Sequence, residues 1–369
     1  MKKIFSALLV SASFTLQAQV TNTATLDTTG GQQIGNTSIG GYLDLYYGYN
    51  LNQPSGNAIP YYVSSNRHNE LNVNLAFVDL RYQSESIRAR IVPGFGTYMN
   101  ENYAAEPGSL RNLLEASAGF KISKKKNIWL DAGILGSPYT NESAISKDHL
   151  MYTRSLAPEY VPYYLSGLKL SVPLNEKVNF YLYILNGWQQ IKDQNNGKSI
   201  GTQFEWRPNA NNLINWNTYS GDERSLSAST YRMRYFTDIY WLYNAGKNWS
   251  FTSCLYAGRQ DQKTNQNVRS SHYWWQANFI ASRLLTKKLS LAGRLEYFSD
   301  PDRIMLNSLN TIGFSGASGG LCLNYKFTEK SLFRLEGRHF FTTENQFQKN
   351  AATVSNQMTW LVGNITIWF

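Results

Sequence analysis

The feature that most constrains this chain is an alternation of apolar and polar side chains, with a period of two, in segments of about ten residues. In residues 41–51, Leu43 and Leu45 share one face, while Asp44 and Asn50 lie on the other. This period is that of a β-strand with different surroundings on its two faces. Because about ten residues also let a tilted strand cross a bilayer, we expect strands with one face toward lipid and one toward water.

The alternation recurs in sixteen segments up to the end of the chain. In the second segment it places Leu71, Val73, Leu75 and Phe77 on one face, which we expect to be the lipid face. The other segments lie near residues 87–91, 114–122, 128–134, 163–172, 178–188, 199–207, 213–219, 231–243, 249–258, 272–284, 289–298, 313–327, 332–341 and 357–369. The predicted fold is therefore all-β: a transmembrane, antiparallel, up-and-down β-barrel of about sixteen strands.

The connections between these segments alternate in length. Residues 83–86 and 123–127 are short connections, whereas residues 52–69 and 136–161 are long ones. Short periplasmic turns and long extracellular loops are typical of outer-membrane barrels, and a soluble sandwich has no reason to alternate in this way.

The first residues have the three parts of a secretory signal. Lys2 and Lys3 precede the apolar residues 4–16, and Ala18 offers a small residue for cleavage. The apolar run is shorter than the roughly 20 residues that a membrane-spanning helix needs. We predict a signal peptide over residues 1–18, a flexible periplasmic leader over 19–39 and a barrel over 40–369, located in the outer membrane of a Gram-negative bacterium.

The last segment ends on an aromatic residue. Leu361, Ile365, Ile367 and Phe369 share one face. An apolar alternation that ends on Phe is similar to the terminal strand of bacterial outer-membrane proteins, which the barrel-assembly machinery recognises. We therefore expect this machinery and outer-membrane lipid as partners.

A sixteen-stranded barrel is too wide for side chains to fill, so its inward positions would line a channel. A charge that faces lipid costs about 2–4 kcal/mol at mid-membrane, so strand parity should send charges inward. The predicted pore-lining residues are Asp44, Arg88, Arg90, Arg111, Glu115, Asp131, Arg232, Arg234, Asp238, Arg294, Glu296, Arg334, Glu336 and Arg338. Two interpretations stay open: each Arg pairs with a neighbouring carboxylate, or a surplus of positive charge favours anions.

The longest connection, residues 136–161, would be the third external loop. In sixteen-stranded porins this loop folds inward and narrows the channel, and its position suggests the same role here by analogy. Its charged residues of both signs are the predicted constriction residues: Glu142, Lys147, Asp148, Arg154 and Glu159. An exposed surface loop is the alternative.

The sequence offers little for catalysis or metal binding. The histidines His68, His149, His272 and His339 are scattered, and Cys254 and Cys322 form no metal pattern. No Gly-rich phosphate loop stands out. The net charge of +10 at pH 7 is dispersed along strand-like segments, so we expect no nucleic-acid partner, no cofactor, no metal and no enzyme activity.

Several segments also resemble a known family. These are LLEASAGFKI, IWLDAGILGS, NESAISKDHLMYTRSLAPEYVPYYLSGLKLSVPL and LYILNGWQQI within residues 113–191, and GYLDLYYGYN at the first strand. They are similar to the OmpL-like family of beta-barrel porins, which is common in Bacteroidetes, and the resemblance extends over residues 41–221. It implies an outer-membrane barrel and implies neither a substrate nor catalytic residues. Pro138 and Tyr139 depart from the isoleucine and glycine that are more usual there.

The function expected from these observations is passive diffusion of small hydrophilic solutes through a porin that prefers anions. A non-conducting barrel that acts as an adhesin or a surface receptor through its long loops is the alternative. A lipid hydrolase carried on a barrel is a third class, and a homo-oligomer stays open.

Overall fold

The computed structural model describes residues 31–123, 125–225, 232–244, 248–263, 268–306, 308, 312–351 and 353–369. The predicted signal peptide, most of the predicted leader and Lys124 therefore lie outside the described residues. Among the residues that are described, no helix has both the length and the apolar character needed to cross a bilayer.

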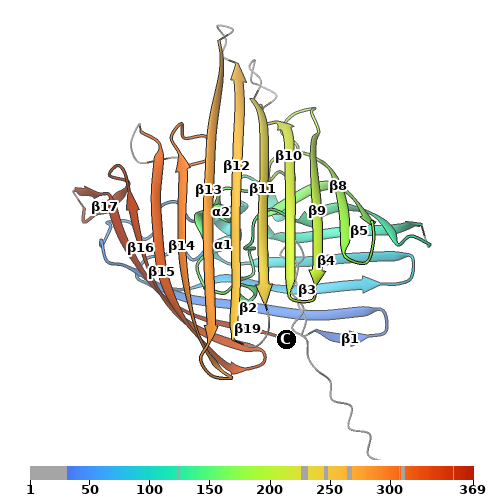
Figure 1. Cartoon of the computed structure of the whole chain (residues 1–369), viewed down its shortest axis with the longest axis horizontal. Coiled ribbons are helices and arrows are strands. Elements are labelled where there is room, and N and C mark those ends of the chain that lie inside the picture. Colours follow the sequence, from blue (N-terminus) through green and yellow to red (C-terminus); the bar gives the residue numbers. More distant parts are fainter. Residues whose placement is uncertain are drawn as a thin grey trace, which may run out of the picture.

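Sixteen antiparallel strands form one closed sheet (Figure 1). They are β2 (Thr37–Asn50), β3 (Glu70–Gln83), β4 (Ile87–Phe95), β5 (Leu113–Ser123), β6 (Ile128–Gly136), β7 (Tyr164–Pro173), β8 (Val178–Leu185), β9 (Ser199–Asn209), β10 (Asn212–Asp222), β11 (Arg232–Asn244), β12 (Trp249–Lys263), β13 (Arg269–Leu284), β14 (Leu289–Asp300), β15 (Phe314–Thr328), β16 (Ser331–Thr342) and β19 (Gln357–Trp368). Each strand pairs with the next along the chain, and β19 pairs with β2 to close the barrel. The predicted fold class and strand number are confirmed.

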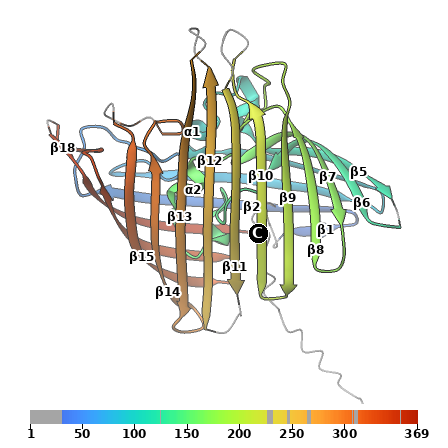
Figure 2. The same ribbon diagram turned by 45° about the horizontal axis from the view of Figure 1, so that its top comes forward.

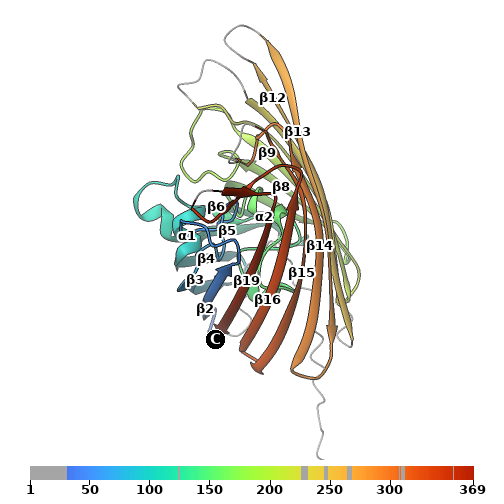
Figure 3. The same ribbon diagram turned by 90° about the vertical axis from the view of Figure 1, so that its left-hand side faces the viewer.

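The remaining elements are short. β1 (Gln32–Ile34) pairs with β2, and β17 (Phe347–Lys349) pairs with β18 (Thr353–Ser355). The helices are α1 (Thr97–Asn102), α2 (Leu156–Glu159) and the 3-10 turns η1 (Gly108–Asn112) and η2 (Ser146–Asp148). In Figures 1 and 2, α2 lies behind the strands of the near wall. Figure 3 shows α1 at one edge of the barrel, near β3 and β4, and shows β12 and β13 extending above the other strands.

The end of the predicted leader takes part in the sheet. Residues 32–34 and 37–39 pair as a hairpin, so the expected flexible leader over 19–39 is wrong for its last residues. The turn between them contains Gly35 at φ 58°, a conformation that glycine adopts at little cost. This turn places β1 beside the start of the barrel.

Strand parity is interrupted in β3. The register between β2 and β3 shifts where Asp44 faces Leu75 and Leu45 faces Val73, so Asn74 is an extra residue in the ladder. A β-bulge of this kind reverses which face the following side chains occupy. Leu75 and Phe77 are therefore buried in the lumen, and our expectation that they face lipid is wrong.

Elsewhere the outward face is apolar, as a lipid-facing surface requires. Exposed outward side chains include Ile239, Leu255, Phe279, Leu295, Leu321, Leu335 and Leu361. Trp206 and Trp249 are also exposed and lie at strand ends beside the short turns, where aromatic side chains favour the membrane interface. The short turns identify this end of the barrel as periplasmic, and the C-terminus lies there (Figure 1).

Candidate functional site in the barrel lumen

The predicted pore-lining residues lie, with one exception, on inward strand positions. Asp44, Arg88, Arg90, Glu115, Asp131, Arg234, Asp238, Arg294, Glu296, Arg334, Glu336 and Arg338 are all buried or half-buried there, and Arg232 is exposed at the extracellular end of β11. The exception is Arg111. It belongs to η1 in the loop between β4 and β5, where its guanidinium donates to the Glu106 carbonyl (2.6 Å) and the Ala104 carbonyl (2.8 Å). The strand predicted to follow begins only at Leu113, so parity does not apply to Arg111.

Loop L3, residues 137–163 between β6 and β7, lies inside the barrel. Its backbone N–H groups donate to carboxylates that project inward from the far wall. The Tyr152 and Thr153 N–H groups donate to Glu336 (2.9 Å each), and the Leu156 N–H donates to Glu296 (2.7 Å). The Thr140 N–H of the loop donates to the carboxylate of Asp238 on β11 (2.7 Å).

Arginines of the same wall hold the loop carbonyls. Arg294 donates to the Thr153 carbonyl (2.6 Å), and Arg338 donates to the Arg154 carbonyl (2.6 Å). Arg294 also pairs with Glu336 (2.8 Å), and Arg338 pairs with Glu296. All four side chains are almost fully buried, so each charge has a partner of opposite sign, as burial requires.

The predicted constriction residues hold the loop in shape. Arg154 donates to the Ser143 carbonyl (3.0 Å) and to the Ala144 carbonyl, and Glu142 accepts from the Ser155 N–H (2.9 Å). Burial raises the pKa of Glu142, while the nearby Arg294 guanidinium acts in the opposite direction. These contacts fold the first part of L3 onto its middle.

The other three constriction residues lie at the margins of L3. Lys147 pairs with Asp148 (2.7 Å), and its ammonium lies 5.7 Å from the centre of the Trp368 ring. Glu159 accepts from the Val63 N–H (2.7 Å) and the Tyr163 hydroxyl (3.0 Å). Burial raises the pKa of Glu159 to about 7, although the Val63 N–H and the Arg154 charge favour its ionised form.

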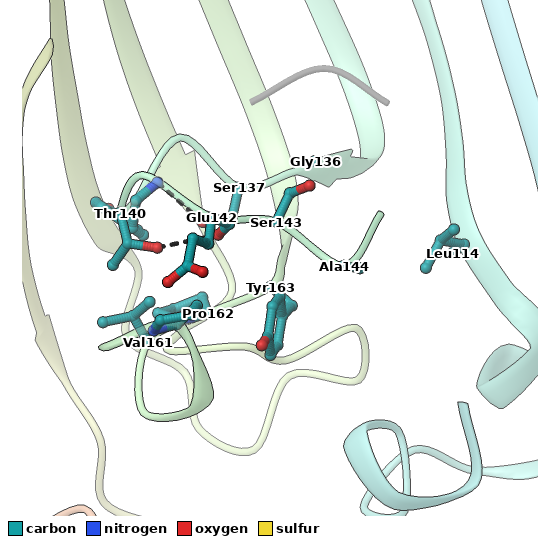
Figure 4. A pocket seen from close by; sticks show the side chains of 12 residues that line it. Leu114, Gly136, Ser137, Thr140, Glu142, Ser143, Ala144, Val161, Pro162 and Tyr163 are labelled. Atoms are coloured by element: carbon teal, nitrogen blue, oxygen red, sulfur yellow. Dashed lines mark hydrogen bonds between the residues drawn. The ribbon is translucent and has the colours of Figure 1, made fainter. Parts of the chain in front are cut away.

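A small cavity lies where L3 leaves and rejoins the barrel (Figure 4). Ser137, Thr140, Glu142 and Tyr163 line it, and its volume of about 20 Å³ is enough for one water molecule. A solute larger than water would not fit.

Buried aromatic side chains gather in the extracellular half of the lumen. Inward residues at the extracellular ends of the strands pack against residues of loop L1 (51–69) and of L3. The packed residues include Phe236, Trp274, Phe298, Phe340 and Trp360 from strands, Ile59 and Tyr62 from L1, and Tyr139, Tyr152 and Leu156 from L3. All of them are buried, at 8% exposure or less. We call this set the aromatic cluster.

The periplasmic half contains a vestibule of about 620 Å³ instead. Its charged lining consists of Arg81, Arg88, Arg90, Lys169, Glu115 and Asp131. Arg90 pairs with Asp79 (2.7 Å) and with Glu115 (2.9 Å), and Arg88 forms a two-atom pair with Asp131. The guanidinium of Arg88 lies 4.4 Å from the centre of the Trp129 ring.

Two of these charged residues, Asp79 and Lys169, were not among the predicted pore-lining residues. Asp79 follows the bulge in β3, so simple alternation placed it toward lipid. Lys169 lies between the outward residues Leu168 and Leu170 of β7, and parity could have found it. In the described part of the chain, no group of three or more His, Cys, Asp or Glu side chains could hold a metal ion.

Comparisons with known proteins agree with this architecture. The family described as "Putative beta-barrel porin-2, OmpL-like" matches residues 36–368. No curated protein matches the sequence.

Among solved structures, the outer membrane channel DcaP of Acinetobacter baumannii is similar, with a TM-score of 0.60 at 9% identity, over 92% of this chain and 99% of that one. OmpT, an outer membrane protein of Vibrio cholerae, gives a TM-score of 0.57 at 11% identity, over 92% and 100%. An anion-selective porin from Comamonas acidovorans gives 0.57 at 7% identity, over 90% and 99%. At such identities these likenesses show the fold alone, and the family match shows the rest: the chain belongs to the OmpL-like beta-barrel porin family of the outer membrane.

Proposed function

We propose that this barrel lets small hydrophilic solutes diffuse passively across the outer membrane, and that L3 narrows its lumen. The observation that carries the proposal is the inward course of L3, whose backbone is bound by Glu296, Glu336 and Arg338 of the opposite wall. A loop fixed across the lumen at this depth limits the width of any passage beside it.

We also propose that the passage prefers anions. Within the described part of the chain, Arg234 and Arg334 have no carboxylate within 4.0 Å, whereas Glu296 and Glu336 are both matched by arginines. Arg234 instead donates to Gln260 (2.7 Å) and lies over the Trp188 ring (5.0 Å). Among the described residues, Asp44 and Asp238 of the same lumen have no Lys or Arg within 4.0 Å either. The proposal therefore rests on the partly exposed guanidinium of Arg234, whose positive charge raises the local concentration of anions.

One observation favours the alternative, a non-conducting barrel that acts as an adhesin or a receptor. The aromatic cluster packs residues of L1 and L3 into the extracellular half of the lumen. A barrel closed in this way would present its long loops as a binding surface.

Recordings in planar bilayers separate the two functions. We expect discrete conductance steps, a reversal potential in a salt gradient that indicates anion preference, and a larger conductance for a variant that lacks residues 143–155. A silent membrane that contains folded protein would favour the adhesin or receptor. Cation preference would remove the selectivity claim, and an unchanged conductance in the deletion variant would remove the constriction claim.

Two partners can also be proposed, one from the C-terminal strand and one from the fold. The Phe369 N–H donates to the Gly41 carbonyl (3.1 Å) and the Gly41 N–H donates to the Phe369 carbonyl (2.9 Å), so the last residue closes the seam of the barrel. This position supports our proposal that the barrel-assembly machinery engages the C-terminal strand. A homo-oligomer is proposed from the fold, since a similar structure of OmpT from Vibrio cholerae is described as a trimer form.

A further inference from the structure

A row of charged residues crosses four neighbouring strands in the wall of the vestibule. Arg88 of β4 faces Gly119 of β5, Gly119 faces Asp131 of β6, and Asp131 faces Lys169 of β7. Directly opposed residues on neighbouring strands are normally the closest partners. Lys169 is therefore the expected partner of Asp131.

Asp131 turns the other way, across Gly119. A Cβ atom on Gly119 would lie 2.2 Å from Oδ1 of Asp131, so the carboxylate occupies the space that a side chain would take. In that position Asp131 accepts from Nε of Arg88 (2.6 Å) and also from Nη2. Arg88 is held from its other side by the Trp129 ring (4.4 Å). The missing side chain at residue 119 thus lets Arg88 take the carboxylate of its more distant neighbour.

Lys169 is left without a carboxylate. In the part of the chain that the structure describes, no acidic oxygen lies within 4.0 Å of its ammonium, and the centre of the Tyr181 ring is 5.9 Å away. The three arginines of the vestibule lining each have an acidic partner: Arg81 pairs with Asp79, Arg90 with Asp79 and Glu115, and Arg88 with Asp131. Lys169 is the cation in this lining that has no carboxylate within 4.0 Å.

We propose that Lys169 binds the oxyanion of a small organic carboxylate in the periplasmic vestibule. The vestibule volume of about 620 Å³ is within the range of small-molecule sites. The ring of Tyr181 lines the same cavity and offers a face for an apolar or planar part of the ligand. The inference rests on the proposed function for the route by which such an anion arrives.

Calorimetric titration of the detergent-folded barrel with benzoate tests this site. We expect binding by the wild type, a loss of about tenfold or more in affinity for Lys169→Gln, and retention by Lys169→Arg. Lys177→Gln removes a positive charge from an exposed periplasmic turn, and it should leave benzoate binding unchanged. Equal affinity of wild type and Lys169→Gln would overturn the proposal.

A second variant leaves Lys169 in place. In Gly119→Ala the new methyl group occupies the position of the Asp131 carboxylate, so Asp131 should turn toward Lys169 and weaken benzoate binding. Undiminished binding by this variant would contradict the assignment. Titration with inorganic phosphate tests the class of ligand. Weaker binding of phosphate than of benzoate supports a carboxylate ligand, and tighter binding of phosphate overturns it. Because calorimetry needs no conduction, loss of the site and loss of channel function are observed separately.

Discussion

The two halves of the lumen are built on the same strands but contain opposite chemistry. Toward the extracellular side, inward positions hold Phe236, Trp274 and Phe340, which pack against L1 and L3. Toward the periplasm, inward positions hold charged residues such as Arg88 and Lys169 around an open vestibule. Alternation therefore decides which side chains point inward, whereas the residue types at those positions decide whether the interior is dry or wet.

Buried charges of the opposite wall hold L3 inside the lumen. Glu336 accepts hydrogen bonds from Tyr152 and Thr153 of the loop and pairs with Arg294 of the wall. Pairs of this kind contribute little relative to an apolar replacement, but removing one member leaves a buried charge without compensation. The loop should therefore be sensitive to single changes in this network.

The largest expected effect comes from breaking this network. Glu336→Ala removes one acceptor of Arg294 and the acceptor of the Tyr152 and Thr153 N–H groups, so we expect a loss of about 4 kcal/mol in the free energy of unfolding. Urea titration of the detergent-folded protein measures it. Glu70→Ala is the control, because Glu70 and Arg67 form a partly exposed pair at 3.9 Å, and it should cost less than about 1 kcal/mol. Similar losses for both variants would contradict a buried anchor.

The next effect separates the inner and outer faces of one strand. Phe340 is 2% exposed within the aromatic cluster, and its neighbour Phe341 is 52% exposed on the lipid face. Phe340→Ala should cost about 3 kcal/mol through the cavity it leaves, whereas Phe341→Ala should cost about 1 kcal/mol. The same titration gives both values, and the reverse order would mean that the extracellular half is not packed.

The smallest effect depends on pH and concerns the contact between L1 and L3. Burial raises the pKa of Glu159 to about 7 from an ordinary value near 4.5. Because burial makes ionisation of Glu159 unfavourable, the packing of L1 against L3 is most stable below about pH 4.5. It loses about 2 kcal/mol, once partial exposure of the side chain is considered, as the pH rises through 7.

Hydrogen exchange at the Val63 amide, corrected for its intrinsic pH dependence, measures this change. Protection should be greater at pH 5 than at pH 8 in the wild type. Glu159→Gln should remove the difference, because the amide cannot ionise. A pH dependence that survives in the variant would assign the effect to another group.

Much of the fold could be predicted from the sequence, because a lipid-facing strand requires a regular alternation. The predicted inward and outward faces were wrong where the backbone interrupts that alternation. The bulge at Asn74 turns Phe77 and Asp79 inward, and Arg111 lies in η1 and not in a strand of the wall. The turn at Gly35 was missed because the polar residues around it show no apolar period.

The contacts of the site were less predictable than its residues. Parity gave Glu296, Glu336 and Arg338 as inward residues, but their binding to L3 joins segments that are distant in the sequence. The lack of a carboxylate within 4.0 Å of Lys169 depends on Gly119, which carries no functional group at all. Such contacts depend on strand register and on packing between distant segments, which cannot be read from the residue types alone.

The most direct test of the contrast between the two halves is the reactivity of introduced thiols. Cys254 and Cys322 are buried and would both be replaced by Ala, and a single Cys would be introduced at Ser117 in the vestibule or at Met358 in the aromatic cluster. A charged, water-soluble methanethiosulfonate should modify the Cys at 117 rapidly and the Cys at 358 only after unfolding. Equal rates in the folded barrel would contradict a lumen that is dry toward the outside and wet toward the periplasm.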